Sequence, residues 1–512
     1  MNRFSVVAVV LTLAACSGGG TPTPSPSNSP LTITPATATV SPGDAPITLT
    51  ATLIGSSGTI NWSLGPATDA GTLSATTGTS VQYTPPTQIA STQTVTLTAT
   101  AGTASKSVQI KLKPLAQFYA ESSVGLDTNP GTQGKPLKTI REALARMGVG
   151  ATKTTVLTAG TYNEASGETW GYDYPEGVVL KVNTSGVVLQ SLGKKAGFKF
   201  AGSATFSDLT LTGFGTAFEA STGALTLTRL NFKSNQTDLK LNGVADSGPS
   251  ASLQDCTSSG TTHSLLTYGA SKLTVQNGTF NGLASGSVLG MQARGETRFT
   301  GTNIGGGGLY VNGAAFLSLK DVVSVGSGVL VSDYGLLEIE GGSFSNVQGN
   351  TSAVRSLGGD IKVKNSSFSG NYSAIISEGG NVFLNNISVG NSDWAGILLR
   401  PPTSSGRPLT FRMRNSTVYA SKTYGIEYDS NPTRPVGSID LGTASDPGGN
   451  TLLNNVFRNL QVKANATLTA VGNTWNANIQ GADAQGRYAA ARVDGPKSGD
   501  NYYIDSGVSI QF

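Results

Sequence analysis

The chain has 512 residues, of which only 12% are charged, and its 34 basic residues nearly balance its 30 acidic ones. Glycine is abundant, with 66 residues, and this profile is typical of an extracellular all-β protein with many short strands and turns. Basic residues form no cluster beyond short pairs such as Lys194-Lys195, which argues against nucleic-acid binding. His263 is the only histidine, which argues against a histidine zinc site and a Ser-His-Asp triad.

The first 16 residues predict an export signal, because Arg3 precedes an apolar run at residues 4–13 that is too short to span a membrane. The run ends in LAAC at residues 13–16, which resembles the lipobox of bacterial lipoproteins. The resemblance implies cleavage before Cys16, acylation of that residue and anchoring to the cell envelope; the alternative is an ordinary signal peptide. Ser17 resembles the pattern for outer-membrane sorting, if the host has two membranes. With Cys16 acylated, Cys256 has no partner for a disulfide.

Residues 17–30 are rich in Gly, Pro and Ser, which predicts a flexible tether. Residues 31–113 hold six or seven short Thr-, Val- and Ile-rich stretches separated by turn residues, which predicts a β-sandwich with Trp62 in its core. Trp62 and the sequence YTPP at residues 83–86 resemble bacterial immunoglobulin-like domains. The resemblance implies a spacer or adhesive module without chemistry of its own.

The main body spans residues 117–512 and opens with an expected cap. Apolar residues from Leu137 to Met147 have helical spacing and predict an amphipathic helix over residues 136–147. This helix, the turn at residues 127–132 (DTNPGT) and the following GTY at residues 160–162 resemble the opening of the domain of unknown function 1565 family and of polysaccharide lyase family 9. The sequence GNTWN at residues 472–476 resembles the end of the former family. Both resemblances imply a capped right-handed parallel β-helix.

Internal repeats independently predict the same fold. Each unit has two apolar residues in alternation, a polar turn and a third apolar residue seven positions after the first. Units begin at Leu225, Leu273, Thr297, Leu317, Leu337, Ile361, Val382, Phe411 and Leu468. From Leu273 to Phe411 the starts lie 20 to 29 residues apart, as in a β-solenoid. We expect about eleven coils with a length of roughly 50 Å.

The turn position of several units is asparagine, which tolerates the left-handed conformation. These residues are Asn277, Asn365, Asn386 and Asn415. Outward-facing charges are expected to stack with alternating sign, from Lys320 to Glu338 and Glu340 and then to Lys362 and Lys364. Each exposed pair contributes only ~0–1 kcal/mol, so we interpret this ladder as an aid to register and solubility.

A second row of strands is predicted at residues 374–378, 396–400, 425–429 and 459–463. In this register Glu378, Arg400, Asp429 and Lys463 stack on one outward line. Glu427 faces the same way, and Tyr428 points into the core. Two insertions, at residues 401–408 and 430–437, emerge beside this row and favour a groove there.

The first functional hypothesis is an exported, membrane-anchored lipoprotein that binds cell-envelope or extracellular polysaccharide. Trp394 and Tyr424 would stack on sugar rings, and Arg400 and Arg407 would pair with acidic groups. The alternative for these residues is that the aromatic side chains fill loop cores and the charges form another solvated ladder.

The second hypothesis is a polysaccharide lyase or glycoside hydrolase, with Glu378, Glu427 and Asp429 as the catalytic candidates, because glycosidases use paired carboxylates. Family 9 lyases hold calcium in an aspartate cluster, and we find no comparable cluster in this sequence. The third hypothesis is a structural component of the envelope or surface layer. We assign no metal site, although the oxygen-rich turn from Asp127 to Asn129 leaves calcium possible.

Overall fold

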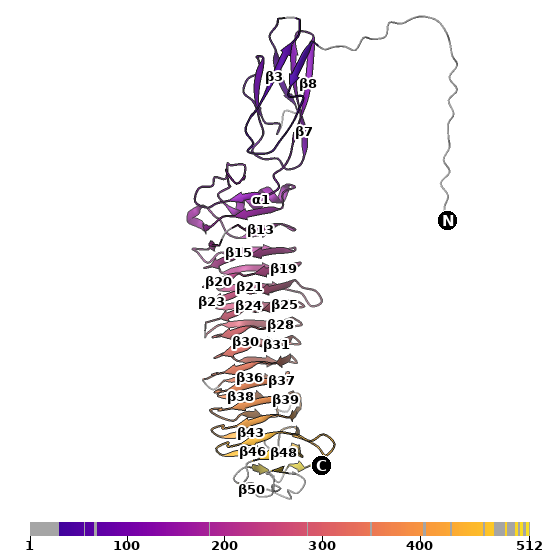
Figure 1. The fold of residues 1–512 in the computed structure, drawn as a ribbon. Helices are drawn as coiled ribbons and strands as arrows, with labels where there is room; N and C mark the ends of the chain where they lie inside the picture. Colours follow the sequence, from indigo (N-terminus) through magenta and orange to yellow (C-terminus); the bar gives the residue numbers. More distant parts are fainter. Residues whose placement is uncertain are drawn as a thin grey trace, which may run out of the picture. The chain divides into compact units, whose positions relative to one another are not determined.

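The computed structural model describes residues 30–55, 57–65, 69–183, 185–283, 285–348, 351–402, 406–430, 433–463 and 466–475, and beyond them 487–488, 497–499, 502–504 and 508–510. The expected signal peptide, Cys16 and the tether up to residue 29 lie outside the described residues. The chain divides into two compact units, and the first comprises residues up to Val40, Asp44–Pro86 and Gln93–Leu112 (Figure 1).

The first unit consists of two four-stranded sheets. One has the order β1 (Leu31–Thr34), β3 (Ile47–Leu53), β6 (Ser80–Thr84), β5 (Thr72–Leu73), and the other β2 (Thr37–Val40), β8 (Ala104–Leu112), β7 (Gln93–Ala101), β4 (Asn61–Gly65). Trp62 on β4 is buried, as predicted, and its Nε1 donates a hydrogen bond to the carbonyl of Gly78 at 2.8 Å. The pair of sheets is confirmed, whereas the immunoglobulin-like assignment stays a prediction.

The second unit opens with β9 (Phe118–Ala120) and the helix α1 (Ile140–Val149). The helix begins four residues later than predicted because Thr139 caps it, its side chain accepting a hydrogen bond from the Glu142 amide at 3.1 Å. Asp127 holds the preceding residues extended, since its carboxylate accepts from the amides of Lys138 and Thr139, both at 2.9 Å. The apolar residues of the predicted helical face are all buried, namely Leu137, Ile140, Ala143, Leu144 and Met147.

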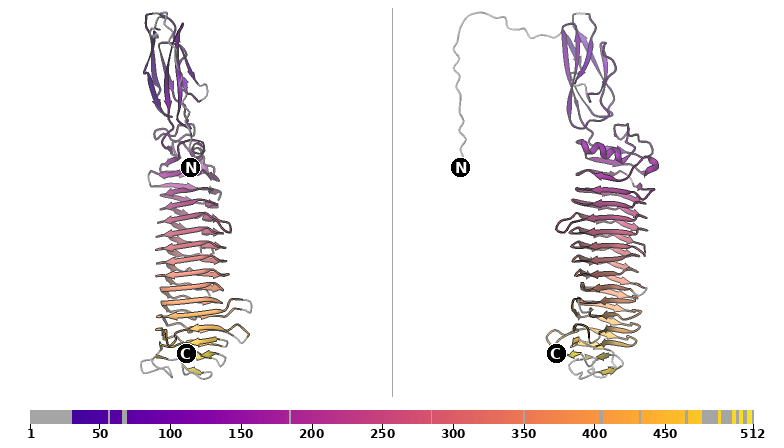
Figure 2. Two further views of the ribbon diagram at one scale, coloured as in Figure 1. Left: turned by 90° about the vertical axis from the view of Figure 1, so that its right-hand side faces the viewer. Right: turned by 180° about the vertical axis from the view of Figure 1, so that it is seen from behind.

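The rest of the unit is a β-solenoid of about thirteen turns over residues 154–474, which confirms the predicted fold with two more coils than expected. The extra coils lie where the repeat pattern was weak. Each coil contributes a strand to each of three rows, and strands of successive coils pair in parallel, so that they stack along one axis (Figure 2). No helix among the described residues is long and apolar enough to cross a membrane.

The strands of the three rows are as follows. The first row contains β10 (Thr154–Leu157), β13 (Val179–Val182), β16 (Ala204–Ser207), β19 (Ala224–Thr228), β22 (Ser250–Gln254), β25 (Lys272–Gln276), β28 (Glu296–Thr300), β31 (Phe316–Lys320), β34 (Leu336–Glu340), β37 (Asp360–Ser369), β39 (Gly380–Gly390), β41 (Leu409–Arg414), β44 (Gly437–Asp440) and β47 (Ala466–Thr469). The second contains β11 (Gly160–Tyr162), β14 (Val187–Gln190), β17 (Leu209–Thr212), β20 (Asn231–Lys233), β23 (Thr257–Ser259), β26 (Thr279–Asn281), β29 (Asn303–Gly305), β32 (Val323–Val325), β35 (Ser343–Ser345), the ends of β37 and β39, β42 (Thr417–Tyr419), β45 (Thr451–Leu453) and β48 (Asn473–Trp475). The third contains β12 (Tyr172–Tyr174), β15 (Ala196–Phe200), β18 (Thr216–Ala220), β21 (Thr237–Asn242), β24 (His263–Tyr268), β27 (Ser287–Gln292), β30 (Gly308–Asn312), β33 (Val329–Ser332), β36 (Ser352–Leu357), β38 (Ser373–Ser377), β40 (Ile397–Leu399), β43 (Tyr424–Tyr428), β46 (Arg458–Val462) and β51 (Tyr502–Ile504).

The repeat pattern sets the register of the coils. Leu317, Leu337, Ile361, Val382 and Phe411 are direct neighbours on successive strands of the first row, and all are fully buried. The four predicted turn asparagines have φ values of 51–52°, in the left-handed region. Each coil therefore turns at a fixed point, which keeps the outward positions of successive coils in columns.

Candidate functional site

A groove with a volume of about 690 Å³ runs over the outward face of the first row, from β28 to β41. We call it the charged groove. Its lining combines six basic and two acidic side chains with one exposed aromatic ring. The lining residues that the argument uses are Arg298, Lys320, Glu338, Glu340, Lys362, Lys364, Phe383, Asn385, Arg412 and Arg414. It contains the charge ladder that the sequence predicted. The sequence interpretation gave this ladder a role in register and solubility only and predicted no groove here.

The ladder itself is confirmed. Lys320 pairs with Glu340 in the register of β31 and β34, and Glu340 with Lys364 in that of β34 and β37. The ammonium of Lys362 lies 3.2 Å from Glu338, and that of Lys364 lies 3.1 Å from Glu340. These side chains are 41–57% exposed, so water screens the pairs and a charged ligand can replace either partner at little cost.

Phe383 occupies the next position in the same column. On β37, β39 and β41 the residues Lys362, Phe383 and Arg412 are direct neighbours, as are Lys364, Asn385 and Arg414. Phe383 faces outward and is 38% exposed, whereas most phenylalanines of the solenoid are fully buried. An apolar ring therefore lies open to solvent with a cation on the coil before it and another on the coil after it.

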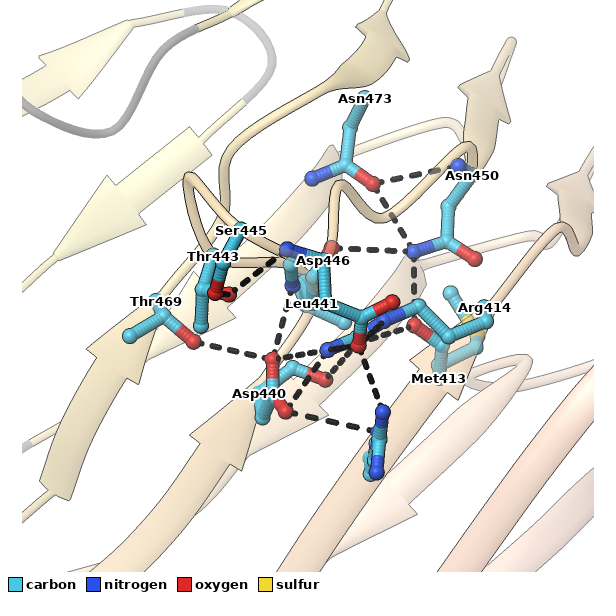
Figure 3. Close-up of polar contacts among 12 residues, drawn as sticks. Met413, Arg414, Asp440, Leu441, Thr443, Ser445, Asp446, Asn450, Thr469 and Asn473 are labelled. Atoms are coloured by element: carbon cyan, nitrogen blue, oxygen red, sulfur yellow. Dashed lines mark hydrogen bonds and ion pairs between the residues drawn. The ribbon is translucent and has the colours of Figure 1, made fainter. Parts of the chain in front are cut away.

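Arg414 fixes the end of the groove (Figure 3). It is buried, and its Nη2 lies 2.8 Å from each carboxylate oxygen of Asp440. Its Nε donates to Asp446 at 2.8 Å, and its Nη1 donates to the carbonyl of Met413 at 2.9 Å. Asp446 lies in the connection between β44 and β45, so Arg414 ties this connection to the sheet.

Arg412 shares these carboxylates but remains accessible. Its Nη2 donates to Asp446 at 2.5 Å, and its Nε lies 3.7 Å from Asp440, yet its side chain is 49% exposed. Hydrogen bonds from Arg414 and Arg412 hold the pKa of Asp446 below its ordinary value, so its carboxylate is ionised. The guanidinium of Arg414 is already hydrogen-bonded within the protein, so Arg412 is the arginine that can reach a ligand.

The predicted outward line on the third row is confirmed. The register of β38, β40 and β43 places Glu378, Arg400 and Asp429 after the ends of consecutive strands. Asp429 accepts from Lys463 at 2.8 Å and lies 3.8 Å from Arg400. Glu378 pairs with Arg355 at 2.7 Å, on the preceding coil.

Glu427 is nearly sealed from solvent, at 5% exposure. Its Oε1 accepts from Gln461 at 3.2 Å and lies 3.5 Å from the ammonium of Lys463. Burial raises the pKa of Glu427, against the lowering effect of Lys463. Tyr428, between the two carboxylates, is fully buried as predicted. This cluster places a buried carboxyl with a raised pKa beside the more exposed carboxyl group of Asp429.

The remaining predicted ligand-binding residues do not gather at that cluster. The guanidinium of Arg407 pairs with Asp360 at 2.9 Å and lies 5.3 Å from the ring centroid of Tyr334. Trp394 lies three residues before the start of β40, and Arg400 lies one residue after its end. The extended chain between Trp394 and Arg400 is therefore on the order of 20 Å long.

The two predicted aromatic residues belong to two separate pairs of aromatic rings on the outer surface. The ring of Trp394 is parallel to that of Tyr372, with centroids 6.4 Å apart, and Trp394 is 38% exposed. Tyr424 packs on the buried pair Ile376 and Leu398 and contacts the exposed Phe457 edge-on at 5.8 Å. Each of the two side chains therefore has an aromatic neighbour on the outer surface, and their role in ligand binding stays a prediction.

The turn considered for calcium is occupied by protein donors. The carbonyl oxygens of Asp127 and Asn129 accept hydrogen bonds from Arg146 at 2.6 and 2.7 Å. The Asp127 carboxylate accepts from the cap of α1. These two carbonyl oxygens and the Asp127 carboxylate therefore anchor the helix.

The missed groove residues had a signal in the sequence. Phe383 and Arg412 occupy the outward position between the two alternating apolar residues of their repeats, as Lys362 does. Extending the predicted ladder by two coils would have found them. Asp446 had no such signal, because it lies in an irregular connection.

Comparison with protein families gives two adjacent matches. Residues 123–304 match a family described as "Protein of unknown function (DUF1565)", and residues 307–474 match "Right handed beta helix region". The predicted resemblance to the domain of unknown function 1565 family is thus confirmed, and the right-handed β-helix with it, whereas the resemblance to polysaccharide lyase family 9 stays a prediction. Among curated proteins, no sequence matches the chain.

Several solved structures resemble the fold distantly. The A-module of a mannuronan C-5 epimerase from Azotobacter vinelandii is 16% identical, with a TM-score of 0.38, covering 66% of this chain and 93% of its own. The catalytic domain of a GH87 α-1,3-glucanase is 11% identical, with a TM-score of 0.43 and coverages of 77% and 87%. A GH136 lacto-N-biosidase from Eubacterium ramulus is 10% identical, with a TM-score of 0.24 and coverages of 77% and 67%.

Proposed function

We propose that this protein is an exported lipoprotein whose β-helix binds an acidic polysaccharide along the charged groove. The observation that carries the proposal is the placement of Phe383 between Lys362 and Arg412 in one outward column. An exposed ring offers an apolar face to a sugar, and the flanking cations offer charge-assisted hydrogen bonds to carboxylate or sulfate groups.

A polymer fits this groove better than a small ligand. The lining extends over the consecutive strands β28, β31, β34, β37, β39 and β41, which spans about 24 Å at the usual strand spacing. The surface is open and polar at its rim, whereas pockets for small molecules enclose most of their ligand. A chain of sugar rings can lie along it and place successive rings against successive coils.

Binding is tested by calorimetric titration of the full-length protein, purified in detergent, with acidic and neutral oligosaccharides. Phe383→Ala and Arg412→Gln should each weaken binding of the acidic ligands about tenfold or more, and added salt should weaken it further. Tyr310→Ala is the matched control, because Tyr310 is a similarly exposed aromatic residue on the third row. If no acidic glycan binds, the proposal fails and a purely structural role in the envelope becomes the better account.

The lipid anchor is supported by the LAAC sequence at residues 13–16. Cys16→Ser should move the protein from the membrane fraction to the soluble exported fraction and remove the acyl mass from its N-terminal peptide. A wild-type N-terminal peptide without that mass would contradict lipidation. Outer-membrane location, in a host with two membranes, is measured by fractionation in the same experiment.

Glycoside hydrolysis is the second candidate function, and the raised pKa of Glu427 beside Asp429 favours it. Hydrolases pair a protonated carboxyl with an ionised one. Release of reducing ends from a polysaccharide panel should then disappear in Glu427→Gln and in Asp429→Asn and decrease in Glu378→Gln. Turnover that survives the first two changes would exclude this site.

A further inference from the structure

The charged groove contains a segment with alternating character along the solenoid axis. The strand β37 contributes Lys362 and Lys364, and β41 contributes the accessible Arg412, beside the buried Arg414 that the protein already saturates. The strand between them, β39, contributes Phe383 and Asn385, which carry no charge. Neighbouring parallel strands lie about 4.8 Å apart, so the two cationic tiers are separated by about 10 Å.

Carboxylates limit this segment at both ends. Before β37, the tier on β34 presents Glu338 and Glu340. After β41, the column continues to Asp440 on β44, and Asp446 lies against Arg412 and Arg414. An anionic group placed one coil beyond either cationic tier would therefore meet a carboxylate of like charge.

The centre of the segment disfavours a charge for a different reason. A carboxylate above Phe383 would lose water to an aromatic ring whose face is itself electronegative. Asn385 cannot supply a compensating full charge. A neutral sugar ring has no such cost and covers the exposed face of Phe383.

We propose that the groove selects an acidic glycan in which charged and neutral sugars alternate. This inference rests on the proposed function and specifies the ligand class of the same site. A sugar ring in an extended chain advances by about one coil, so anions on every second sugar meet the β37 and β41 tiers together. A polymer with an anion on every sugar instead places one anion over Phe383.

The test compares three size-matched hexasaccharides on the full-length protein by calorimetric titration: an alternating uronate and N-acetylhexosamine oligomer, a homopolymeric uronate, and a neutral chitin oligomer. The alternating oligomer should bind at least tenfold more tightly than the homouronate, despite carrying half its charge. Equal affinity, or tighter homouronate binding, overturns the spacing inference and leaves the proposed function standing. Failure of both acidic oligomers overturns the proposed function itself.

A variant that adds a charge to the middle tier should reverse the preference between the two acidic oligomers. Phe383→Lys places a cation on the middle tier and should strengthen homouronate binding while weakening the alternating oligomer, so that the preference inverts. Tyr310→Lys adds the same charge outside the groove and should leave the preference unchanged. Both positions face outward and are about 40% exposed, so the fold is retained, as circular dichroism checks. An unchanged preference in Phe383→Lys would overturn the inference.

Discussion

Arg414 and Asp440 form a two-point contact, with Nη2 of the arginine 2.8 Å from each carboxylate oxygen of the aspartate. Asp440 also accepts from the hydroxyl of Thr469 at 3.1 Å and from the amide of Gly442 at 2.9 Å. One buried guanidinium thus holds the end of β44 and, through Asp446, the connection that follows it. The groove end is built around this side chain.

Arg414→Gln should destabilise the solenoid by about 2 kcal/mol, because the hydrogen bonds from a buried guanidinium to two partly exposed carboxylates are lost. Arg412→Gln, at a half-exposed position, should cost less than about 1 kcal/mol. Calorimetric unfolding of the full chain measures both. Similar unfolding temperatures for the two variants would show that Arg414 does not stabilise the groove end.

Asp238 should make stability depend on pH. It is fully buried, and burial raises the pKa of its carboxyl to about 7, although Ser258, Asn235 and Thr261 donate to it. The unfolded value is about 3.9, so the folded state binds the proton more tightly. The contribution of Asp238 to the free energy of unfolding is therefore complete below about pH 4 and is lost as the pH rises to about 7.

Asp238→Asn should remove that decline, so that the variant gains in unfolding temperature relative to wild type between pH 4 and 7. Glu168, whose pKa burial also raises to about 7, leaves part of the slope in place. Asp208→Asn is the control, because the hydrogen bond from Arg229 lowers the pKa of Asp208. The stability from this group is lost as the pH falls, which is opposite to the pH dependence expected for Asp238. A pH profile of Asp238→Asn parallel to wild type would refute the assignment.

Buried asparagines join coils at a second kind of turn. Oδ1 of Asn371 accepts from the amide of Val347 at 3.0 Å, and its Nδ2 donates to the carbonyl of Phe344 at 3.1 Å. Asn235 and Asn455 make the same pair of bonds to the preceding coil. Each side chain satisfies a backbone amide and a carbonyl that would otherwise be buried without partners.

Asn371→Leu should therefore cost at least about 2 kcal/mol, since two buried backbone groups lose their partners. Asn386→Gly, at an exposed turn where glycine keeps the left-handed conformation and the side-chain bond to Asn365 is lost, should cost less than half as much. Thermal unfolding and amide exchange at Val347 measure the effect. Continued protection of that amide in Asn371→Leu would contradict it.

The coil register was predictable because its cause is local. Alternating apolar residues fix which side chains face inward, and a left-handed asparagine fixes where each coil turns. Once Leu337 and Ile361 are aligned, the positions of Glu338 and Lys362 follow, and the ion pair confirms them. The same reasoning correctly placed Asp429 beside Arg400 and Lys463.

The groove was less predictable because its boundaries depend on irregular segments. Asp446 reaches Arg414 across 32 residues of sequence, through a connection without repeat character. The guanidinium of Arg407 contacts Asp360, 47 residues earlier in the chain, and the repeat pattern did not predict this contact. The repeat register predicts which residues of successive coils lie side by side, but it does not predict the contacts of residues in irregular connections.

Lys463 is the side chain that controls the third-row cluster, because it contacts both Glu427 and Asp429. Lys463→Met removes the nearest cation and leaves the two carboxylates facing each other, so the pKa of Glu427 should rise further. An acid whose folded pKa is raised stabilises the fold less as the pH increases, so the unfolding temperature of Lys463→Met should decline more steeply than that of wild type above about pH 5. Adding Glu427→Gln to this variant should restore the shallower slope, since no buried carboxyl then remains in this cluster to ionise. A double variant as steep as Lys463→Met would show that the slope arises elsewhere and that Lys463 does not act through Glu427.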